Sequence, residues 1–492
     1  MSVGTRPVVP GFHPDPSVCV VDGEYLLACS SFEYAPGVPL FRSTDLRTWE
    51  QIGHVLDRPE QLDVRDAGPA GGVFAPTLRH HGGRCWMATT NWTDEGGQLI
   101  SWATDPAGPW SVPARIPGAV GIDPDLAWDD DGTCLMTYAG FGALGGIVQS
   151  AIDPVTGEVL TPPRRIWSGT GGKFPEGPHL YRIGEHWYLL IAEGGTERGH
   201  AVTIARSASP SGPFEACPTG PVLTHRGTDH PVQNTGHADL VHRPDGSWAM
   251  VFHGVRARGA SPEWHVLGRE TFAVDIDWVD GWPVVAGPVE PIGPVDEVVV
   301  RELTGPGTGP EWVAAERFPA ELTRWTDRGL VVGPGFLGTR QEQLFCDVTA
   351  DLEVTGTGGV ALRIDPRHGL ELEVADGRVS AVWAVGDVRH VLGTRELPAG
   401  TQLRIATSPG TEPRPFSTGL GPDRVTAGIV VDGAFEALGS VDGRYVSTEV
   451  AGGMTGRLAG ITCTDGRVLV RALRYRGSDA ADALLEGGGV AG

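Results

Sequence analysis

The stretch DPSVCVVDGEYLLA at residues 15–28 decides the fold of the first half of this chain. Its two β-prone runs flank a tight turn at residues 21–23, which is typical of a β-hairpin. The pattern is a small or acidic residue, an apolar residue, a polar turn with glycine and an aromatic-rich run. It returns as APTLRHHGGRCWMA from Ala75, DPDLAWDDDGTCLMTY from Asp123, GPHLYRIGEHWYLLI from Gly177 and HADLVHRPDGSWAMVF from His237.

The five copies are spaced at intervals of 48 to 60 residues, beginning at 15, 75, 123, 177 and 237. The rest of each interval holds further strand-like runs, such as residues 37–52 and 97–111. About four strands per repeat, repeated five times, is typical of a β-propeller. Alternation alone leaves a long sandwich or two stacked barrels open, but the near-constant interval favours an all-β, five-bladed propeller over residues 1–300.

The composition agrees with short strands and tight turns. The chain has 72 Gly and 40 Pro among 492 residues, which disfavours long helices because these are the two worst helix formers. The 15 Trp and 14 Phe argue against disorder.

The charge balance limits the class of partner. The chain carries 38 basic and 61 acidic residues, a net charge of −23, which argues against nucleic acid and anionic membranes. The sequence contains no run of about 18 apolar residues, which a membrane-spanning helix would need. Seven widely spaced Cys without a CxxC motif disfavour a disulfide scaffold. With no apolar signal region near the start, we expect a cytoplasmic protein, and a homo-oligomer stays open.

Three carboxylates mark equivalent points of the repeats. Asp15 and Asp123 open their copies, and Glu176 stands one residue before its copy, where the fifth copy has His237 and the second has Ala75. The innermost strands of a propeller line its central channel, so these side chains should converge. Gathered carboxylates raise one another's pKa values, which suits acid–base chemistry. The alternative is that Asp before Pro only starts a turn.

Seven motifs in order give a more specific indication, because together they resemble glycoside hydrolase family 43, most closely its β-xylosidase and α-L-arabinofuranosidase branch. They are PVVPGFHPDPS at 7–17, SSFEYAPGVPLFRSTDLRTW at 30–49, GIDPDLAWDDDG at 121–132, EGPHLYR at 176–182, IAEGGTERGHAVTIARS at 191–207, TGHADLV at 235–241 and LGRETF at 267–272.

The resemblance implies an inverting exo-glycosidase in which Asp15 is the general base, Glu176 the general acid and Asp123 the residue that tunes the pKa of Glu176. Inversion needs one carboxylate and one carboxylic acid on opposite faces of the sugar. Repulsion from Asp123 would keep Glu176 protonated. These are the three acids that the repeats select independently.

The resemblance also implies substrate contacts. Arg269 would bind the non-reducing sugar, with an ordinary ion pair as the alternative. Phe32 would wall the sugar site, with core packing as the alternative, and Phe74 stands where the family often has Trp. His237 resembles a channel histidine that can bear a divalent cation such as calcium. Since calcium prefers oxygen ligands, a hydrogen bond to the acids is the alternative, and the chemistry itself requires no cofactor.

The second half of the chain has a different organisation. After a Pro- and Gly-rich stretch near residues 286–310, alternating runs from 311 to 477 predict an antiparallel β-sandwich, and 478–492 reads as a flexible tail. GGMTG at 452–456 takes the place of a family loop that closes the sugar pocket, so Met454 would occupy the position of its aromatic residue. A purely structural domain or a carbohydrate-binding module is the alternative.

The leading function is therefore release of xylose from the non-reducing end of short β-1,4-xylo-oligosaccharides. Release of α-L-arabinofuranosyl units is the runner-up, because the motifs do not separate the two sugars. A non-catalytic sugar-binding propeller or a protein-interaction propeller would not need the three acids.

Overall fold

The computed structural model describes residues 5–93, 97–290, 297–303, 305, 309–410 and 420–484. Its chain forms two compact units. Unit 1 comprises residues 1–9, 13–256 and 270–292, and unit 2 comprises residues 10–12, 257–269 and 293–492. Among the described residues, no helix is long and apolar enough to cross a membrane.

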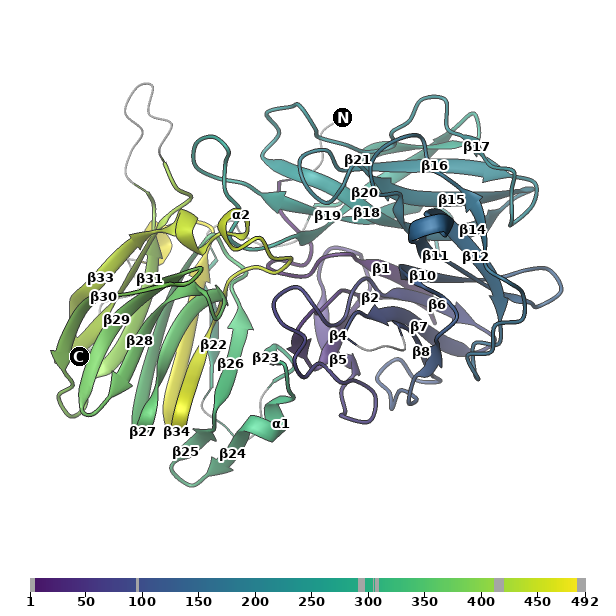
Figure 1. Ribbon diagram of the computed structural model, residues 1–492. Coiled ribbons are helices and arrows are strands. Elements are labelled where there is room, and N and C mark those ends of the chain that lie inside the picture. The colour runs from purple at the N-terminus through teal and green to yellow at the C-terminus, as the bar shows by residue number, and fades with distance from the viewer. Residues whose placement is uncertain are drawn as a thin grey trace. The chain divides into compact units, whose positions relative to one another are not determined.

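Unit 1 is a five-bladed β-propeller in which each blade is a four-stranded antiparallel sheet. The strands follow one another from the innermost to the outermost (Figure 1). The blades are β1 (Ser17–Val21), β2 (Glu24–Ala28), β4 (Gly37–Ser43) and β5 (Glu50–Leu56); β6 (Thr77–His81), β7 (Arg84–Asn91), β8 (Gly97–Ala103) and β9 (Ala114–Ile116); β10 (Gly121–Trp128), β11 (Cys134–Gly140), β12 (Gly146–Ile152) and β13 (Arg164–Trp167); β14 (Glu176–Ile183), β15 (His186–Glu193), β16 (Ala201–Ser207) and β17 (Glu215–Ala216); β18 (Val232–His242), β19 (Trp248–Arg256), β20 (Glu270–Val279) and β21 (Trp282–Pro288). The short strand β3 (Tyr34–Ala35) and the one-turn helix η1 (Gly142–Leu144) lie in connecting segments.

Each predicted hairpin forms the two inner strands of one blade. In the first, Ser17 pairs with Ala28 and Val21 with Glu24 around the turn at Asp22 and Gly23. Both turn residues have positive φ, 50° and 86°, as a two-residue hairpin turn requires. The amino-terminal residue Val9 exchanges backbone hydrogen bonds with Thr271 of β20 at 3.2 and 3.1 Å, which ties the start of the chain to the fifth blade and closes the ring.

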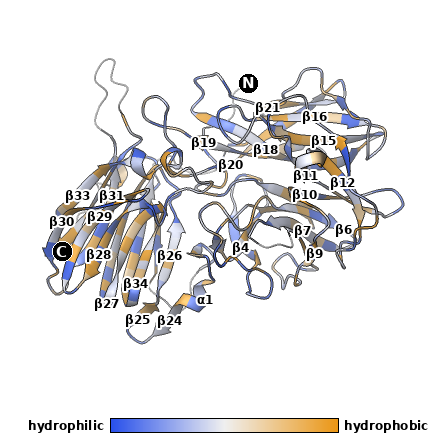
Figure 2. Ribbon diagram, viewed as in Figure 1, coloured by the Kyte–Doolittle hydropathy of each residue, from blue (hydrophilic) through white to orange (hydrophobic). Residues whose placement is uncertain are grey.

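Unit 2 is an antiparallel sandwich around one apolar core. Its elements are β22 (Val299–Glu302), β23 (Trp312–Ala315), α1 (Pro319–Leu322), β24 (Thr323–Thr326), β25 (Gly329–Val332), β26 (Gly335–Arg340), β27 (Phe345–Asp365), β28 (His368–Ala375), β29 (Arg378–Val385), β30 (Val388–Glu396), β31 (Gln402–Ser408), β32 (Arg424–Val431), β33 (Ala434–Asp442), η2 (Gly443–Val446), α2 (Thr448–Ala451), β34 (Leu458–Ser478) and η3 (Asp482–Leu484). Figure 2 shows apolar and polar residues alternating along these strands.

Two 21-residue strands, β27 and β34, organise the sandwich by pairing along their length. The first part of β27 pairs with β31 and its last part with β28. The sequence of this stretch has two β-prone runs, 344–354 and 359–365, with glycines between them. The glycines between them do not end the strand, because a register shift between Thr357 and Gly358 absorbs the irregularity.

The predicted tail is only partly described. Ser478 is still the last residue of β34, and residues 482–484 form η3, whose Leu484 is buried. Residues 485–492 lie outside the described residues.

Candidate active site

Four of the five repeats have a residue with a positive φ angle at or just before the inner strand, where the sequence places its polar residues. Asp15, Asp123, Gly177 and His237 have φ angles of 56°, 57°, 55° and 46°. In the third, fourth and fifth blades these residues lie at register shifts in the inner strand pair. A bulge re-aims side chains at the edge of a sheet, so the repeat presents one residue per blade in an equivalent way.

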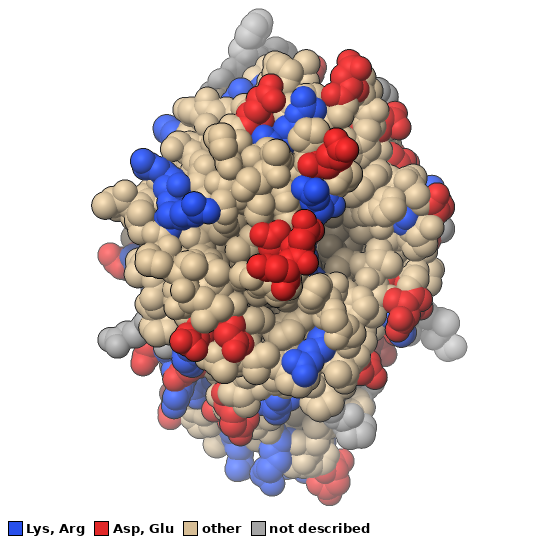
Figure 3. Space-filling model, turned by 90° about the vertical axis from the view of Figure 1, so that its right-hand side faces the viewer, with Lys and Arg blue, Asp and Glu red and all other residues tan. Residues whose placement is uncertain are grey.

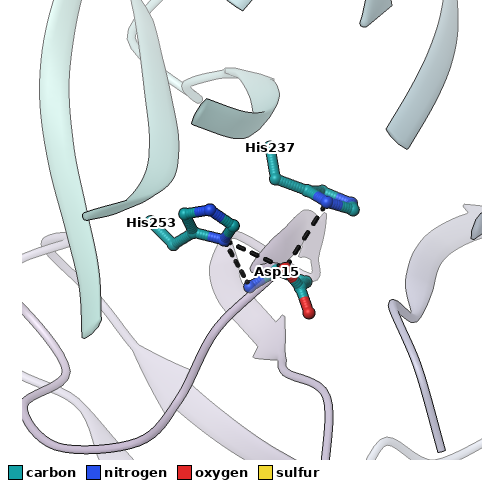
Figure 4. A group of neighbouring side chains, drawn as sticks. All are labelled: Asp15, His237 and His253. Atoms are coloured by element: carbon teal, nitrogen blue, oxygen red, sulfur yellow. Dashed lines mark hydrogen bonds and ion pairs between the residues drawn. The ribbon is translucent and has the colours of Figure 1, made fainter. Parts of the chain in front are cut away.

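Asp15 is buried and surrounded by hydrogen-bonding groups from two blades. Ser30 Oγ donates to Asp15 Oδ2 at 2.5 Å. Asp15 Oδ1 lies 3.0 Å from His253 Nδ1 and 3.4 Å from His237 Nδ1. Figure 4 shows both imidazoles directed at this carboxylate, His237 from β18 and His253 from β19. Asp15, His237 and His253 are 4%, 6% and 0% exposed, so the polar contacts are shielded from water and strengthened.

A second set of contacts connects His237 and Asp123 to the strand of Glu176. The backbone N–H of Gly177 donates to Asp123 Oδ2 at 3.1 Å. A Cβ atom added to Gly177 would lie only 2.9 Å from His237 Nε2, so the imidazole packs directly on this glycine. The residue after Glu176 is therefore held between Asp123 and His237, and His237 in turn contacts Asp15.

The loop before Glu176 is fixed by a buried glutamate that the sequence patterns did not single out. Glu193, at the end of β15, accepts hydrogen bonds from the backbone N–H groups of Thr170 and Gly172 at 2.9 and 3.0 Å. The hydroxyls of Thr170 and Thr203 donate to its other oxygen, both at 2.7 Å. With four donors satisfied, Glu193 anchors the segment that leads into Glu176.

A polar ring lies two residues further along each inner strand. At this position the five repeats carry Ser17, Thr77, Asp125, His179 and Asp239. The ring lies between blades, because Asp125 accepts from Leu180 N–H at 2.8 Å and Asp239 accepts from Val18 N–H at 3.0 Å.

Arg79 joins the acids of this polar ring. Its guanidinium lies 2.6 Å from Asp125 Oδ1 and 3.0 Å from Asp239 Oδ2. Burial works to raise the pKa of Asp239, but the charge of Arg79 together with His179 and the hydrogen bonds from Ser17 and Tyr181 outweighs burial, and the pKa is lowered. The residues of this network were not predicted from the sequence, although their common position two residues further along each repeat was a signal that could have revealed them.

Aromatic rings follow one another across three blades of unit 1. The centroids of Phe32 and Phe74 lie 5.4 Å apart, and Trp92 stacks on Phe74 at 5.7 Å with an interplanar angle of 13°. Phe141 meets Trp92 edge-on at 5.8 Å. Phe32 is 3% exposed, whereas Trp92 and Phe141 are 54% and 44% exposed. The predicted Phe32 and Phe74 are thus brought together, and the row continues to two exposed rings that the sequence did not suggest.

The predicted Arg269 and Met454 both belong to unit 2. Arg269 Nη2 donates to the backbone carbonyl of Met454 at 3.5 Å, so these two residues are also brought together. Arg269 is 7% exposed and Met454 is 38% exposed.

The segment that carries Arg269 is an excursion of the chain between β19 and β20. His265 Nδ1 lies 2.6 Å from Glu449 Oε1, and Arg457 N–H donates to the carbonyl of Val266 at 2.8 Å. Burial works to raise the pKa of Glu449, but its hydrogen bond and ion pair with His265 outweigh burial and the pKa is lowered. Unit 2 therefore fixes the segment 257–269 that leads to Arg269.

The group Asp15, His237 and His253 is the arrangement among the described residues that could hold a metal ion, since one ligand atom from each lies within 4.8 Å of the others. Two imidazoles and one carboxylate do not fit directly bound calcium, which takes six to eight oxygen ligands. The separations of 3.0 and 3.4 Å from Asp15 Oδ1 are those of polar contacts between the side chains themselves.

Comparison with known proteins shows which proteins this chain resembles. The family model described as glycosyl hydrolases family 43 matches residues 4–283. A xylosidase/arabinosidase of Butyrivibrio fibrisolvens is 41% identical over 83% of this chain and 85% of its own length. A non-reducing end α-L-arabinofuranosidase of Bacteroides ovatus is 33% identical over 93% of this chain and 90% of its own length. A solved structure, the xyloglucan-locus family 43 protein B of Bacteroides ovatus, covers 96% of this chain and 99% of its own with a TM-score of 0.84 and 30% identity.

Proposed function

Because the chain belongs to glycosyl hydrolase family 43, and is therefore a glycoside hydrolase, we propose that it is an inverting exo-glycosidase that releases xylose from the non-reducing end of β-1,4-xylo-oligosaccharides. The observation that carries this proposal is the linked arrangement of Asp15, Asp123 and the Glu176 strand, in which Asp15, Asp123 and Gly177 have similar positive φ angles at equivalent points of three repeats. Hydrolysis with inversion needs a basic and an acidic carboxyl group that act on opposite sides of one bond.

Asp15 is the general base in this proposal. Ser30 donates to one of its oxygens, and the two imidazoles face the other. Hydrogen bonds to the charged form favour that form. An ionised Asp15 takes a proton from water as the water attacks the anomeric carbon, and the glycosidic bond breaks on the opposite face.

Glu176 is the general acid that protonates the departing glycosidic oxygen. Asp123 is held beside it through the N–H of Gly177, and a neighbouring negative charge favours the neutral, proton-carrying form of a carboxyl group. Glu193 holds the preceding loop, which keeps the acid in one orientation.

The aromatic row supplies contacts for the sugar rings. The buried Phe32 and the half-buried Phe74 offer ring faces for the terminal sugar, and the exposed Trp92 and Phe141 offer faces for the rest of the oligosaccharide. We assign hydrogen bonding to the terminal sugar to Arg269, contact with the sugar pocket to Met454, and orientation of Asp15 to His237.

The neutral oligosaccharide fits the surface charge. Figure 3 shows a face on which acidic side chains border a hollow and basic side chains are scattered among acidic ones. The net charge of −23 would repel a polyanion.

An α-L-arabinofuranosidase is the second candidate activity. One relative carries both activities in its name, and another is named for arabinofuranoside hydrolysis alone. The test is a paired assay with an aryl β-D-xyloside and an aryl α-L-arabinofuranoside, followed by NMR of the anomeric configuration of the first product. We expect turnover of the xyloside with inversion. Faster turnover of the arabinofuranoside would favour the second candidate, and no turnover of either would refute both.

The variant Glu176→Ala tests the assignment of Glu176 as the general acid. Removing the proton donor should slow hydrolysis of oligosaccharides strongly but spare substrates with a good leaving group, because these need little protonation.

Dialysis against EDTA tests the remaining prediction about a cation near His237. Since the proposed chemistry uses only carboxyl groups, we expect activity to persist, and a loss restored by calcium would contradict this.

We further propose a cytoplasmic location, which the seven free cysteines support. Cell fractionation would test the location, and sedimentation would show whether the protein forms a homo-oligomer.

A further inference from the structure

His253 and His200 form a buried pair next to Asp15, and no proposed step has used His200. His253 is 0% exposed and His200 is 1% exposed. His253 Nε2 lies 3.3 Å from His200 Nδ1, and the same His200 atom lies 3.1 Å from the backbone oxygen of Asn234. On its other side His253 Nδ1 lies 3.0 Å from Asp15 Oδ1. A continuous path of polar contacts therefore runs from a backbone carbonyl to the proposed base.

The carbonyl at the far end determines where the protons lie. A backbone oxygen only accepts hydrogen bonds, so His200 Nδ1 must carry the proton that points to Asn234. A protonated His200 Nδ1 cannot accept a hydrogen bond from His253 Nε2, 3.3 Å away, so His253 Nε2 is the ring nitrogen without a proton. A neutral imidazole carries one proton, and His253 therefore carries it on Nδ1, facing the carboxylate of Asp15.

One neighbouring contact competes with this arrangement. The backbone N–H of Asp15 lies 3.1 Å from the same His253 Nδ1, and this nitrogen cannot both accept from the N–H and donate to the carboxylate. Donation to the carboxylate is the stronger interaction, because hydrogen bonds to a charged acceptor are about twice as strong as neutral ones. A proton on His253 Nδ1 also agrees with the proton assigned to His200 Nδ1.

We propose that His253, oriented by His200, is a positioning residue that holds the Asp15 carboxylate for its role as general base. This inference rests on the proposed function. The Nδ1–H of His253 fixes the direction of Asp15 Oδ1, while Ser30 fixes Oδ2. With both oxygens held, the carboxylate cannot rotate away from the attacking water. Gly236 allows the arrangement, because an added Cβ there would lie 2.2 Å from the His200 ring.

Two matched substitutions test the donor position. In His253→Asn the amide nitrogen replaces Nδ1, one bond from Cγ, whereas in His253→Gln the amide lies one bond further, near the place of Nε2. We expect kcat to fall about 100-fold in His253→Gln with little change in KM, since small misplacements of a reacting group cost about that much. His253→Asn should retain kcat within about 10-fold of the wild type. Equal losses in both variants would overturn the proposal.

A double-mutant cycle separates positioning from general damage to the fold. If His253 acts through Asp15, His253→Gln should slow the residual turnover of Asp15→Asn much less than it slows the wild type. If the two losses multiply, His253 acts independently of the base and the proposal is wrong. Thermal unfolding of each variant shows whether the protein is intact.

A measurement without turnover tests the proton positions in the wild-type protein. Long-range ¹H–¹⁵N spectra of histidine-labelled protein distinguish the two neutral tautomers, and His253→Asn and His200→Gln assign the signals. We expect both rings to carry their proton on Nδ1. A proton on His253 Nε2 would overturn the inference even if the enzyme is active. Absence of glycosidase activity with the expected tautomers would instead refute the proposed function.

Discussion

The two units differ in where their apolar clusters lie. In the propeller, the apolar clusters lie between neighbouring blades, as where Val18 and Leu27 of the first blade meet Val251 and Ala273 of the fifth. Charged and polar side chains of its inner strands form the buried network around Arg79. In the sandwich, a single apolar cluster occupies the space between the sheets, with Leu372 among its fully buried members.

This difference shows where each fold can hold polar catalytic residues. A propeller gains its apolar burial between the faces of adjacent blades, so the inner ends of its strands can carry hydrogen-bonding residues. A sandwich has no such second location, because the space between its sheets is the whole core. Catalytic carboxylates are therefore compatible with the inner strands of the propeller, whereas a charge between the sandwich sheets would have to be paired or neutralised.

The largest expected effect is on catalysis at the inner strands. Asp15→Asn removes the proposed base, so kcat should fall by about 10² to 10⁴ while the unfolding temperature changes little. Asp22→Asn is the matched control, because Asp22 has a similar φ of 50° and lies exposed in the turn of the same hairpin. Steady-state kinetics on an aryl xyloside measures the effect. Full activity in Asp15→Asn would contradict the assignment of the base.

The next effect is on the stability of the propeller. Arg79→Met leaves Asp125 and Asp239, both fully buried, without their cation, and breaking such a buried pair costs about 3–5 kcal/mol. Arg471→Met is the control, since Arg471 pairs with Asp351 at 3.2 Å on the exposed surface and such pairs contribute about 1 kcal/mol at most. Urea unfolding measures both. Equal losses would show that the buried network around Arg79 stabilises the protein no more than the exposed pair of Arg471 does.

Leu372→Ala tests the sandwich core. Removing this side chain, which is 0% exposed, should lower the free energy of unfolding of unit 2 by about 2–5 kcal/mol. The kcat of the folded protein should stay within about 2-fold, because Leu372 touches no proposed site residue. Val388→Ala, at a position that is 56% exposed, should change stability by less than about 0.5 kcal/mol. A large loss of kcat in folded Leu372→Ala would show that the core affects the site.

A smaller effect is expected at the exposed end of the aromatic row. Trp92→Ala should raise KM for xylo-oligosaccharides several-fold, since a stacked aromatic contact contributes about 1 kcal/mol, but should leave an aryl xyloside less affected. Val155→Ala, at a position that is 50% exposed, is the control. An unchanged KM for every chain length would remove Trp92 from the binding surface.

The smallest effect concerns the pH dependence of unit 2. The lowered pKa of Glu449 means that its contribution to stability is present above its unfolded pKa of about 4.3 and is lost as the pH falls below that value. Glu449→Gln should therefore unfold at a lower temperature than the wild type at pH 7, and the two should converge near pH 3. Calorimetry across this range measures the difference. A constant difference would rule out the ionised pair with His265.

Much of the fold could be predicted from local patterns. The five hairpins were visible because each needs only a turn and two β-prone runs. The turn at Asp22 and Gly23 has the positive φ angles that its residues favour. The two strands β30 and β33 were not predicted, because their residues are largely exposed and lack the strict alternation of a half-buried strand.

The candidate site was predicted less completely. Asp15, Asp123 and Glu176 were found because they recur at one point of a repeat. Glu193 and His253 were not, because each stands on a strand where nothing in the repeat marks it, and its partners are distant in the chain. His253 meets Asp15 across 238 residues.

The amino-acid sequence by itself determined the all-β class, the repeat and the place of the three acids within it, since these depend on neighbours a few residues apart. Only the tertiary structure decided that Arg79 joins two buried acids, that unit 2 fixes the segment before Arg269, and that two buried histidines lie in a line of polar contacts with Asp15. The reason is physical. Hydrogen-bond partners and burial depend on which segments meet in space, and local propensity carries no information about that.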